Sequence, residues 1–194
     1  MGGNEDEPSD ARLLAAHRGG DPDAFEALFR RYQGRLCRHL TRMLNDHATA
    51  EDVVIETFQR VHLHRHRFRA GAAVRPWIYA IAGNLASNRL RRQRLVRWLP
   101  LPALHSGRPV AAVAPPTGTQ REVRERVAAA FAALPPRQRE ACSLRLLGEL
   151  SLEEIAAATA TSVGTVKSRL FYGQRRLRAL LADLAPEDGE GAVR

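Results

Sequence analysis

The side chains best suited to chemistry lie close together near the end of the chain, between positions 167 and 175. This stretch carries amine, guanidinium, hydroxyl and aromatic groups. With Val166 set as the inward direction at 100° per residue, Ser168, Phe171, Tyr172 and Arg175 point outward, and Lys167 and Arg169 flank them. Such a face can donate hydrogen bonds, stack on flat rings and neutralise phosphate, which predicts contact with nucleic acid.

Two helices must position this face. Ser151 and Glu154 have the spacing of a capping box, so one helix begins near Leu152. The Thr-rich residues that follow predict a turn at 159–161. Ser162 is a plausible second N-cap, and the apolar residues after it share one helical stripe, which should be buried: Val163, Val166, Leu170, Leu177, Leu181 and Leu184. Positions 151–178 therefore predict a helix-turn-helix unit.

Length and composition indicate a globular protein. The chain has 194 residues, 44% of them hydrophobic, which suits one or two domains. It has no apolar run of about 18 residues and begins with acidic and polar residues, so we expect a cytoplasmic protein without membrane insertion. Cys37 and Cys142 lie far apart without a second ligand cluster, and we expect both to be reduced and packed.

The charge is distributed unevenly. The net charge is +9, and residues 57–121 contain twelve Arg and four His but no Asp or Glu, whereas residues 1–56 hold eleven acids and seven Arg. A block of one sign repels itself in a compact fold unless a polyanion compensates it. Arg bias in the coding composition could explain the excess of Arg over Lys but not the missing acids, so nucleic acid is the expected partner.

The periodicity predicts an all-α fold of two small helical domains joined by a flexible Pro-rich linker, the second domain containing the helix-turn-helix. In the first, helices are expected from Pro22 to about residues 45–49, from just after Thr49, and from Pro76, with a loop at 67–75. In the second, helices are expected from near Arg121 to Leu134 and from Arg137 to Leu147. The expected organisation is an N-terminal extension (1–19), a first domain (20–98), a linker (99–120), a second domain (121–185) and a disordered tail (186–194).

Several motifs in this order resemble those of the extracytoplasmic-function (ECF) sigma factors of the sigma-70 family. They read AEDVVIETFQRV, RPWIYAIAGNLASNRLRR, LPPRQRE, SLEEIA and SVGTVKSRL. The resemblance spans residues 20–98 and 121–184. It implies a protein without catalytic activity or cofactor that binds core RNA polymerase, directs it to promoter DNA and is usually controlled by an anti-sigma factor.

The resemblance also implies roles for individual residues. Contacts with the clamp coiled coil of the polymerase fall on Asp52, Glu56, Gln59 and Arg60. Recognition and melting of the −10 element fall on Phe68, Arg69, Arg75, Trp77, Asn84, Asn88, Arg89, Arg91 and Arg92. Base contacts at the −35 element fall on Lys167, Ser168, Phe171 and Tyr172, and phosphate contacts on Thr165, Arg169, Arg175 and Arg176. The second domain is also expected to touch the polymerase flap.

Simpler interpretations remain open for some of these residues. Asp52 and Glu56 could be an ordinary solvated helix start, which the helix dipole favours. Trp77 could be a core residue, Phe171 could lie at the edge of the core, and the arginines at positions 89, 91 and 92 could form a solvated helix end.

Other functions are compatible with parts of the sequence. A free-standing helix-turn-helix repressor or activator would bind a palindrome as a dimer. A nuclease would need metal-binding carboxylates, which the cationic block lacks. His62 and His66 stand one helical turn apart with His64 between them, a spacing that can chelate a transition metal, but four nearby Arg and no adjacent carboxylate or thiol argue against a metal site.

Overall fold

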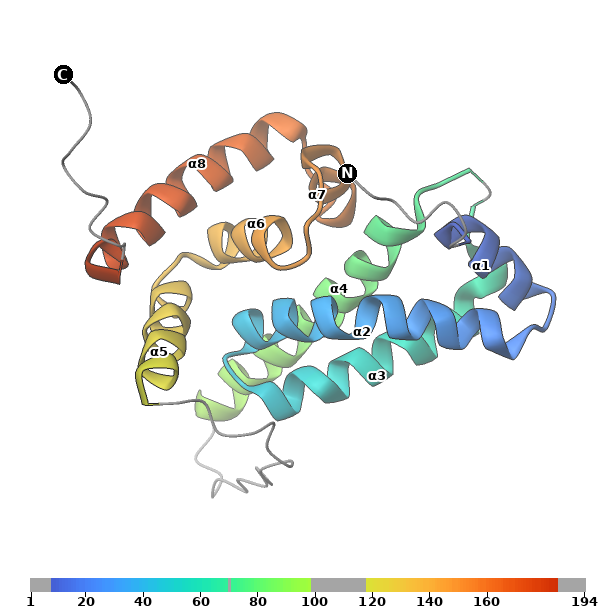
Figure 1. Cartoon of the computed structure of the whole chain (residues 1–194), viewed down its shortest axis with the longest axis horizontal. Helices are drawn as coiled ribbons and strands as arrows, with labels where there is room; N and C mark the ends of the chain where they lie inside the picture. Colours follow the sequence, from blue (N-terminus) through green and yellow to red (C-terminus); the bar gives the residue numbers. More distant parts are fainter. Residues whose placement is uncertain (1–7, 70, 99–117, 185–194) are drawn as a thin grey trace.

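The computed structural model describes residues 8–69, 71–98 and 118–184, and within these ranges it is helical without any strand (Figure 1). The all-α prediction is thereby confirmed. The predicted tail (186–194) and most of the predicted linker (99–117) lie outside the described residues. Among the described helices, none is long and apolar enough to span a bilayer.

The first part of the chain is built around two long antiparallel helices, α2 (Pro22–Leu44) and α3 (His47–His64) (Figure 1). Asp21 caps the start of α2, where Pro22 fits the first turn, and Asn45 ends it in the left-handed conformation at φ 56°. Asp46 then caps α3 through the backbone N–H of Ala48. The sequence expectation that the second helix begins after Thr49 was therefore late by one turn, because Asp46 is the cap.

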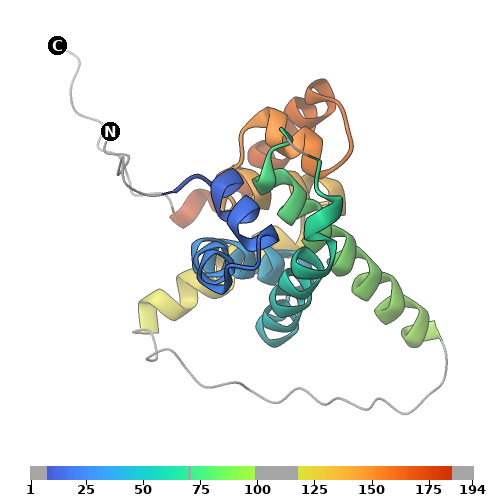
Figure 2. The ribbon, with the colours of Figure 1, turned by 90° about the vertical axis from the view of Figure 1, so that its right-hand side faces the viewer.

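A third long helix, α4 (Val74–Trp98), crosses this pair after a short 3-10 turn, η1 (Arg65–Arg67) (Figure 2). Its apolar side is fully buried at Ile78, Ala82 and Ala86. These residues pack with the inward stripes of α2 and α3 in one hydrophobic core.

The sequence expectations contained no helix before residue 21, and the structure has one, α1 (Asp10–Arg18). Ser9 caps it, and Leu13 and Leu14 are buried in the core. Asp10 at its start forms hydrogen bonds with Arg31 and Tyr32 on α2. Most of the predicted N-terminal extension is therefore packed structure.

The second part contains α5 (Gly118–Ala132), α6 (Pro136–Leu146), α7 (Leu152–Ala158) and α8 (Val163–Leu180), followed by the 3-10 turn η2 (Ala182–Leu184). The capping box of Ser151 and Glu154 is present with both of its hydrogen bonds, and Ser162 caps α8. Helix α5 begins three residues before the expected Arg121. The close contact of α6 with α8 depends on Gly173, because a Cβ there would lie 2.5 Å from Cys142 Sγ.

The two parts pack against each other, with α6 on α2 and α7 on α4 (Figure 1). At the centre of this contact, fully buried His39 on α2 forms a 2.8 Å hydrogen bond with Ser143 on α6. Gly148 lies against the ring of Tyr79 on α4, close enough that an added Cβ would lie 3.1 Å from it. The tight, partly polar contact defines how the two parts are placed, and we call it the inter-module contact.

Candidate nucleic-acid and polymerase interfaces

Helix α8 presents the face that its periodicity predicts. Phe171 is 61% exposed and Tyr172 56% exposed, and their rings meet edge to face with centroids 5.3 Å apart. The opposite side of the helix is buried at Val166, Leu170 and Leu177. Of the remaining residues expected at the −35 element, Lys167, Ser168, Arg175 and Arg176 are exposed, and Thr165 and Arg169 are half-buried. Phe171 therefore stands on the surface rather than at the edge of the core.

Two hydroxyl groups on α8 are already engaged within the helix. The Ser168 hydroxyl donates to the carbonyl of Gly164 at 3.2 Å, and the Thr165 hydroxyl lies 2.9 Å from that of Ser162. A hydroxyl can donate only one hydrogen bond but can accept others. The amine, guanidinium and aromatic groups are thus the free donors and stacking surfaces of this face.

The residues expected at the −10 element are spread over α4 and the segment before it. Phe68 and Trp77 are half-buried and in ring contact at 4.9 Å, and both pack against the hydrophobic core. The surface of α4 then carries an exposed row at helical spacing: Asn84, Asn88, Arg91 and Arg92. Arg69, ahead of α4, is also exposed. This row is basic and amide-bearing, as a surface for a nucleic-acid backbone needs to be.

Arg75, expected to contact DNA, instead faces the second part of the chain. Its guanidinium donates to the carbonyls of Gly148 and Glu149, at 2.7 Å in each case, and lies 3.6 Å from the carboxylate of Glu154. Arg75 thus belongs to the inter-module contact, beside the N-terminal end of α7. Arg35 on α2 forms a second bridge, 3.1 Å from Glu149.

Arg89 has acidic neighbours that the sequence did not indicate. It lies 3.2 Å from Glu56 and 3.9 Å from Asp52, both on α3. Burial acts to raise the pKa of Glu56, but hydrogen bonds from Arg89 and Arg60 outweigh it and lower that pKa. The sequence around Arg89 contains no acid, and its acidic neighbours come from another helix. Three residues assigned to the polymerase, Asp52, Glu56 and Arg60, thus form one ion-pair cluster with Arg89, which is assigned to DNA.

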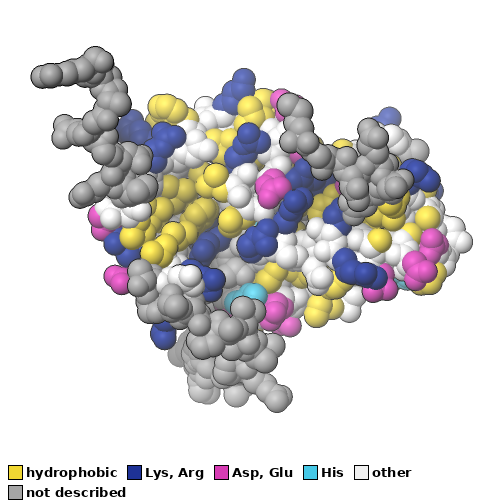
Figure 3. Space-filling model, in the orientation of Figure 1, with side chains coloured by type: hydrophobic (Ala, Val, Ile, Leu, Met, Phe, Trp, Pro, Cys, Tyr) yellow, Lys and Arg dark blue, Asp and Glu magenta, His cyan; other side chains and the backbone are white. Residues whose placement is uncertain are grey.

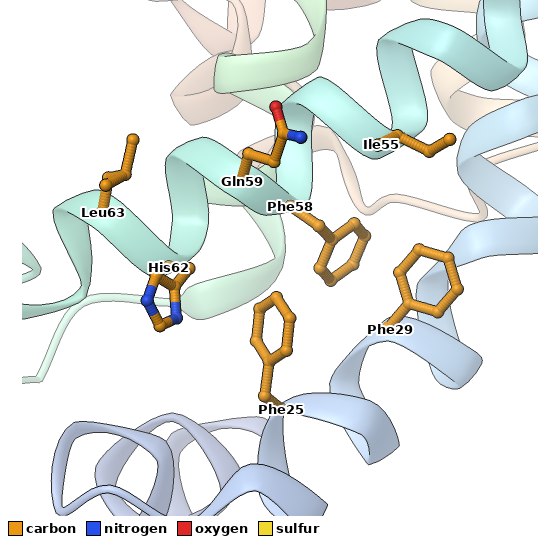
Figure 4. Close-up of a pocket in the computed structure, with 7 residues that line it drawn as sticks. All are labelled: Phe25, Phe29, Ile55, Phe58, Gln59, His62 and Leu63. Atoms are coloured by element: carbon orange, nitrogen blue, oxygen red, sulfur yellow. The ribbon is translucent and has the colours of Figure 1, made fainter.

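An apolar groove lies between α2 and α3, and the sequence did not predict it. Its cavity of about 590 Å³ has a floor of three rings, those of Phe25, Phe29 and Phe58 (Figure 4). Two exposed aliphatic side chains of α3 lie at its edge, Ile55 (54% exposed) and Leu63 (69% exposed). The remaining lining residues are Gln59 and His62. We call it the α2/α3 groove; its sequence signal is the pair of aliphatic residues eight positions apart, off the buried stripe of α3.

His62, near the end of α3, lies beside a histidine of α1. His62 faces buried His17 of α1, with ring nitrogens 3.2 Å apart, rather than His66. Burial lowers the pKa of His17, and the nearby charges of His62, Arg65 and His66 also oppose its protonation. Within the described ranges, no three metal-binding side chains come together.

Comparison with known proteins agrees with this arrangement. Residues 28–96 match the family model for sigma-70 region 2, and residues 124–177 match that for sigma-70 region 4. The chain is 36% identical over 170 residues to the RNA polymerase sigma factor CarQ of Myxococcus xanthus, covering 88% of this chain and 96% of CarQ. It is 34% identical to the ECF RNA polymerase sigma factor SigM of Mycobacterium tuberculosis, covering 94% of this chain and 89% of SigM.

Two solved structures share the fold. CnrH in complex with the cytosolic domain of CnrY aligns with a TM-score of 0.69 at 24% identity, covering 90% of this chain and 97% of that one. The sigma factor RpoE in complex with the anti-sigma factor NepR from Bartonella quintana aligns with a TM-score of 0.61 at 26% identity, covering 76% and 89%. The chain therefore belongs to the ECF sigma factors of the sigma-70 family and is a transcription initiation factor, not an enzyme.

Proposed function

We propose that this protein directs core RNA polymerase to promoters by reading the −35 element with α8 and by holding the −10 element open along α4. The observation that carries the proposal is the exposed face of α8, which presents cations and two aromatic rings to solvent, while the opposite, apolar face of the helix is buried. An α-helix with such a face fits the major groove of duplex DNA.

On α8, the roles divide by chemistry. Base contacts are assigned to Lys167, Ser168, Phe171 and Tyr172, because amines donate to purine acceptors and rings contact thymine methyl groups. The phosphate contacts are assigned to Thr165, Arg169, Arg175 and Arg176.

The −10 element is assigned to α4 and the residues before it. A melted strand needs cations for its backbone and ring surfaces for unstacked bases. The exposed row on α4 supplies the cations and amides, and Phe68 with Trp77 supplies the rings at its start. Arg75 and Arg89 join this surface when they exchange their internal partners for phosphate.

The polymerase clamp is assigned to the α2/α3 groove and the polar residues beside it. Asp52, Gln59 and Arg60 are exposed on α3, next to Ile55 and Leu63, and Glu56 pairs with Arg60 at 2.9 Å. An apolar centre bordered by charges is the usual anatomy of a protein interface. The flap is assigned to the apolar surface between α5 and α8, where Figure 3 shows hydrophobic side chains gathered and where Val123 and Leu180 are exposed.

An anti-sigma protein is the proposed regulator. Both structural neighbours were solved with a bound partner, CnrY for CnrH and the anti-sigma factor NepR for RpoE. A partner helix seated in the α2/α3 groove would exclude the clamp from the same surface. The protein is expected to act in the cytoplasm, where polymerase and promoters are.

Run-off transcription with purified core polymerase tests the proposal. We expect promoter-dependent transcripts from the wild type and a loss of at least about tenfold with Tyr172→Ala/Arg176→Ala, since each contact with a base or phosphate contributes about 1 kcal/mol or more. Arg18→Ala, an exposed cation on α1, is the control and should transcribe normally.

Transcription, compared with DNA binding in the absence of polymerase, separates the rival function. A free-standing repressor would bind a palindromic site as a dimer without polymerase. Tight polymerase-independent binding of that kind, together with no transcripts from any template in the presence of core enzyme, would refute the initiation-factor proposal.

A further inference from the structure

A second cavity lies where the two parts of the chain meet, away from the surfaces assigned above. Its volume is about 620 Å³, and it lies between α2, the start of α3, and α5. Ligand pockets commonly measure about 300–1,000 Å³. Helix α2 contributes one wall, and Arg124 of α5 with Leu147 after α6 contributes the other. We call it the junction cavity.

The junction cavity is strongly basic. Arg38 and Arg42 line it from α2, and Arg124 lines it from α5. Within the described part of the chain, none of these three guanidiniums forms an ion pair with a carboxylate, unlike Arg30 or Arg121 on the same two helices. Figure 3 shows basic side chains gathered between α2 and α6, on the face of the molecule above this region.

The remaining polar groups do not compensate this charge. His47 lines the cavity, where its ring lies 3.7 Å from the Glu51 carboxylate and 3.5 Å from the Cys37 thiol. Burial raises the pKa of that thiol, so it does not supply an anion. Arg42 is half-buried, and its guanidinium stacks over Phe131 of α5 at 5.7 Å. Three like charges around one cavity repel one another, and a bound anion relieves this repulsion.

We propose that the junction cavity binds a compact, multiply charged phosphate compound, such as the diphosphate group of a small molecule. Guanidinium groups bind phosphate oxygens through paired hydrogen bonds, and three arginines that line one cavity from two helices match a diphosphate better than a singly charged ion. Because the arginines come from both parts of the chain, the bound anion ties α5 to α2.

A small anion fits this site better than a nucleic-acid strand. The cavity lies at the junction of two packed parts and is closed on two sides by α2 and α5. A strand needs an open track along which successive phosphates and bases are bound. The exposed row on α4 offers such a track, and the junction cavity does not.

Isothermal titration calorimetry of the full chain with inorganic pyrophosphate, at constant ionic strength, tests the proposal. We expect saturable binding that Arg38→Gln/Arg124→Gln weakens about a hundredfold, since each charge-assisted contact is worth about tenfold. Both residues are exposed, so the variant should fold. Arg30→Gln/Arg121→Gln is the matched control, because it removes the same charge from the same helices and should bind pyrophosphate as the wild type does.

Protection of Cys37 from alkylation gives a second readout, because this thiol lines the cavity and the other cysteine, Cys142, is buried. Pyrophosphate should slow the reaction, and a single-stranded oligothymidylate at equal phosphate concentration should not. Protection by the oligonucleotide alone would overturn the assignment to a small anion. Equal weakening in both double variants would reduce the effect to net charge and would also overturn it. Neither readout involves polymerase or a promoter, so failure here leaves the proposed function intact.

Discussion

Replacing Ser143 with alanine should weaken the packing of the two parts of the chain. The Ser143 hydroxyl donates its one hydrogen to the carbonyl of Glu140 at 3.1 Å, so its oxygen accepts the 2.8 Å hydrogen bond from Nδ1–H of His39. Both residues are buried, with Ser143 fully so. The substitution leaves Nδ1–H without a partner in the interior, which costs about 1–3 kcal/mol.

A double-mutant cycle isolates this hydrogen bond. His39→Leu alone removes the imidazole and its edge contact with Tyr79, at 5.6 Å, but this loss is common to the single and double variants and cancels. With both polar groups replaced, no donor is stranded, so the double variant should be more stable than the two single losses predict. We expect a coupling free energy of about 1–2 kcal/mol from urea unfolding followed by circular dichroism.

A second cycle serves as the control. Thr57 on α3 is buried, but its hydroxyl donates to Val53 of its own helix and shares no partner with Ser143. Thr57→Val and Ser143→Ala should be additive within about 0.5 kcal/mol. A His39–Ser143 coupling as small as that of the control would refute the role of this hydrogen bond in stabilising the inter-module contact.

Three further outcomes are expected. Burial lowers the pKa of His39 to about 3, below the value of 6.5 for a free histidine, so the neutral ring stabilises the fold fully above pH 6.5, and this stabilisation is lost as the pH falls towards 3. Urea unfolding at a series of pH values should show this loss of stability, and His39→Leu should make the stability less dependent on pH. Gly173→Ala should destabilise the protein by about 1–3 kcal/mol through the clash with Cys142, whereas Gly164→Ala on the same helix, with no atom nearer than 3.9 Å to the new Cβ, should be neutral or stabilising, which equal effects would contradict. Ser151→Ala should lose about 1 kcal/mol with the capping box, seen as a lower melting temperature, and an unchanged melting temperature would count against the cap.

Local signals in the sequence predicted the elements that have strong caps and regular stripes. Ser151, Glu154 and Ser162 act within three residues of themselves, so the starts of α7 and α8 could be located without any knowledge of the fold. The same holds for the start of α2 at Asp21. The exposure of Phe171 and Tyr172 followed from helical geometry alone.

Contacts between distant positions could not be predicted in this way. Helix α1 is short, and Asp10 ties it to Arg31 and Tyr32, more than twenty residues away. The acids that pair with Arg89 and Arg75 come from α3 and α7, although the sequence around each arginine contains none. Counting charge along the chain therefore overstated how much of the cationic block is uncompensated in space.

The α2/α3 groove and the junction cavity were missed for the same physical reason. A cavity depends on how two helices diverge, which periodicity does not encode. In the sequence Ile55 and Leu63 look like any other apolar residues, and only the packed helices show that both remain outside the core.

The position of Arg75 has a consequence for how the affinity of this protein for DNA should be read. Its guanidinium donates to the carbonyls of Gly148 and Glu149 and lies 3.6 Å from the Glu154 carboxylate, whose negative charge would repel a phosphate, so packing and promoter binding would compete for this side chain. When the binding-competent form is a minority, the apparent dissociation constant rises in inverse proportion to its population. A packed form favoured by about 3 kcal/mol would weaken apparent binding by about two orders of magnitude. The free chain would then bind DNA weakly, and a partner that separates the two parts would raise the affinity for DNA without contacting DNA itself.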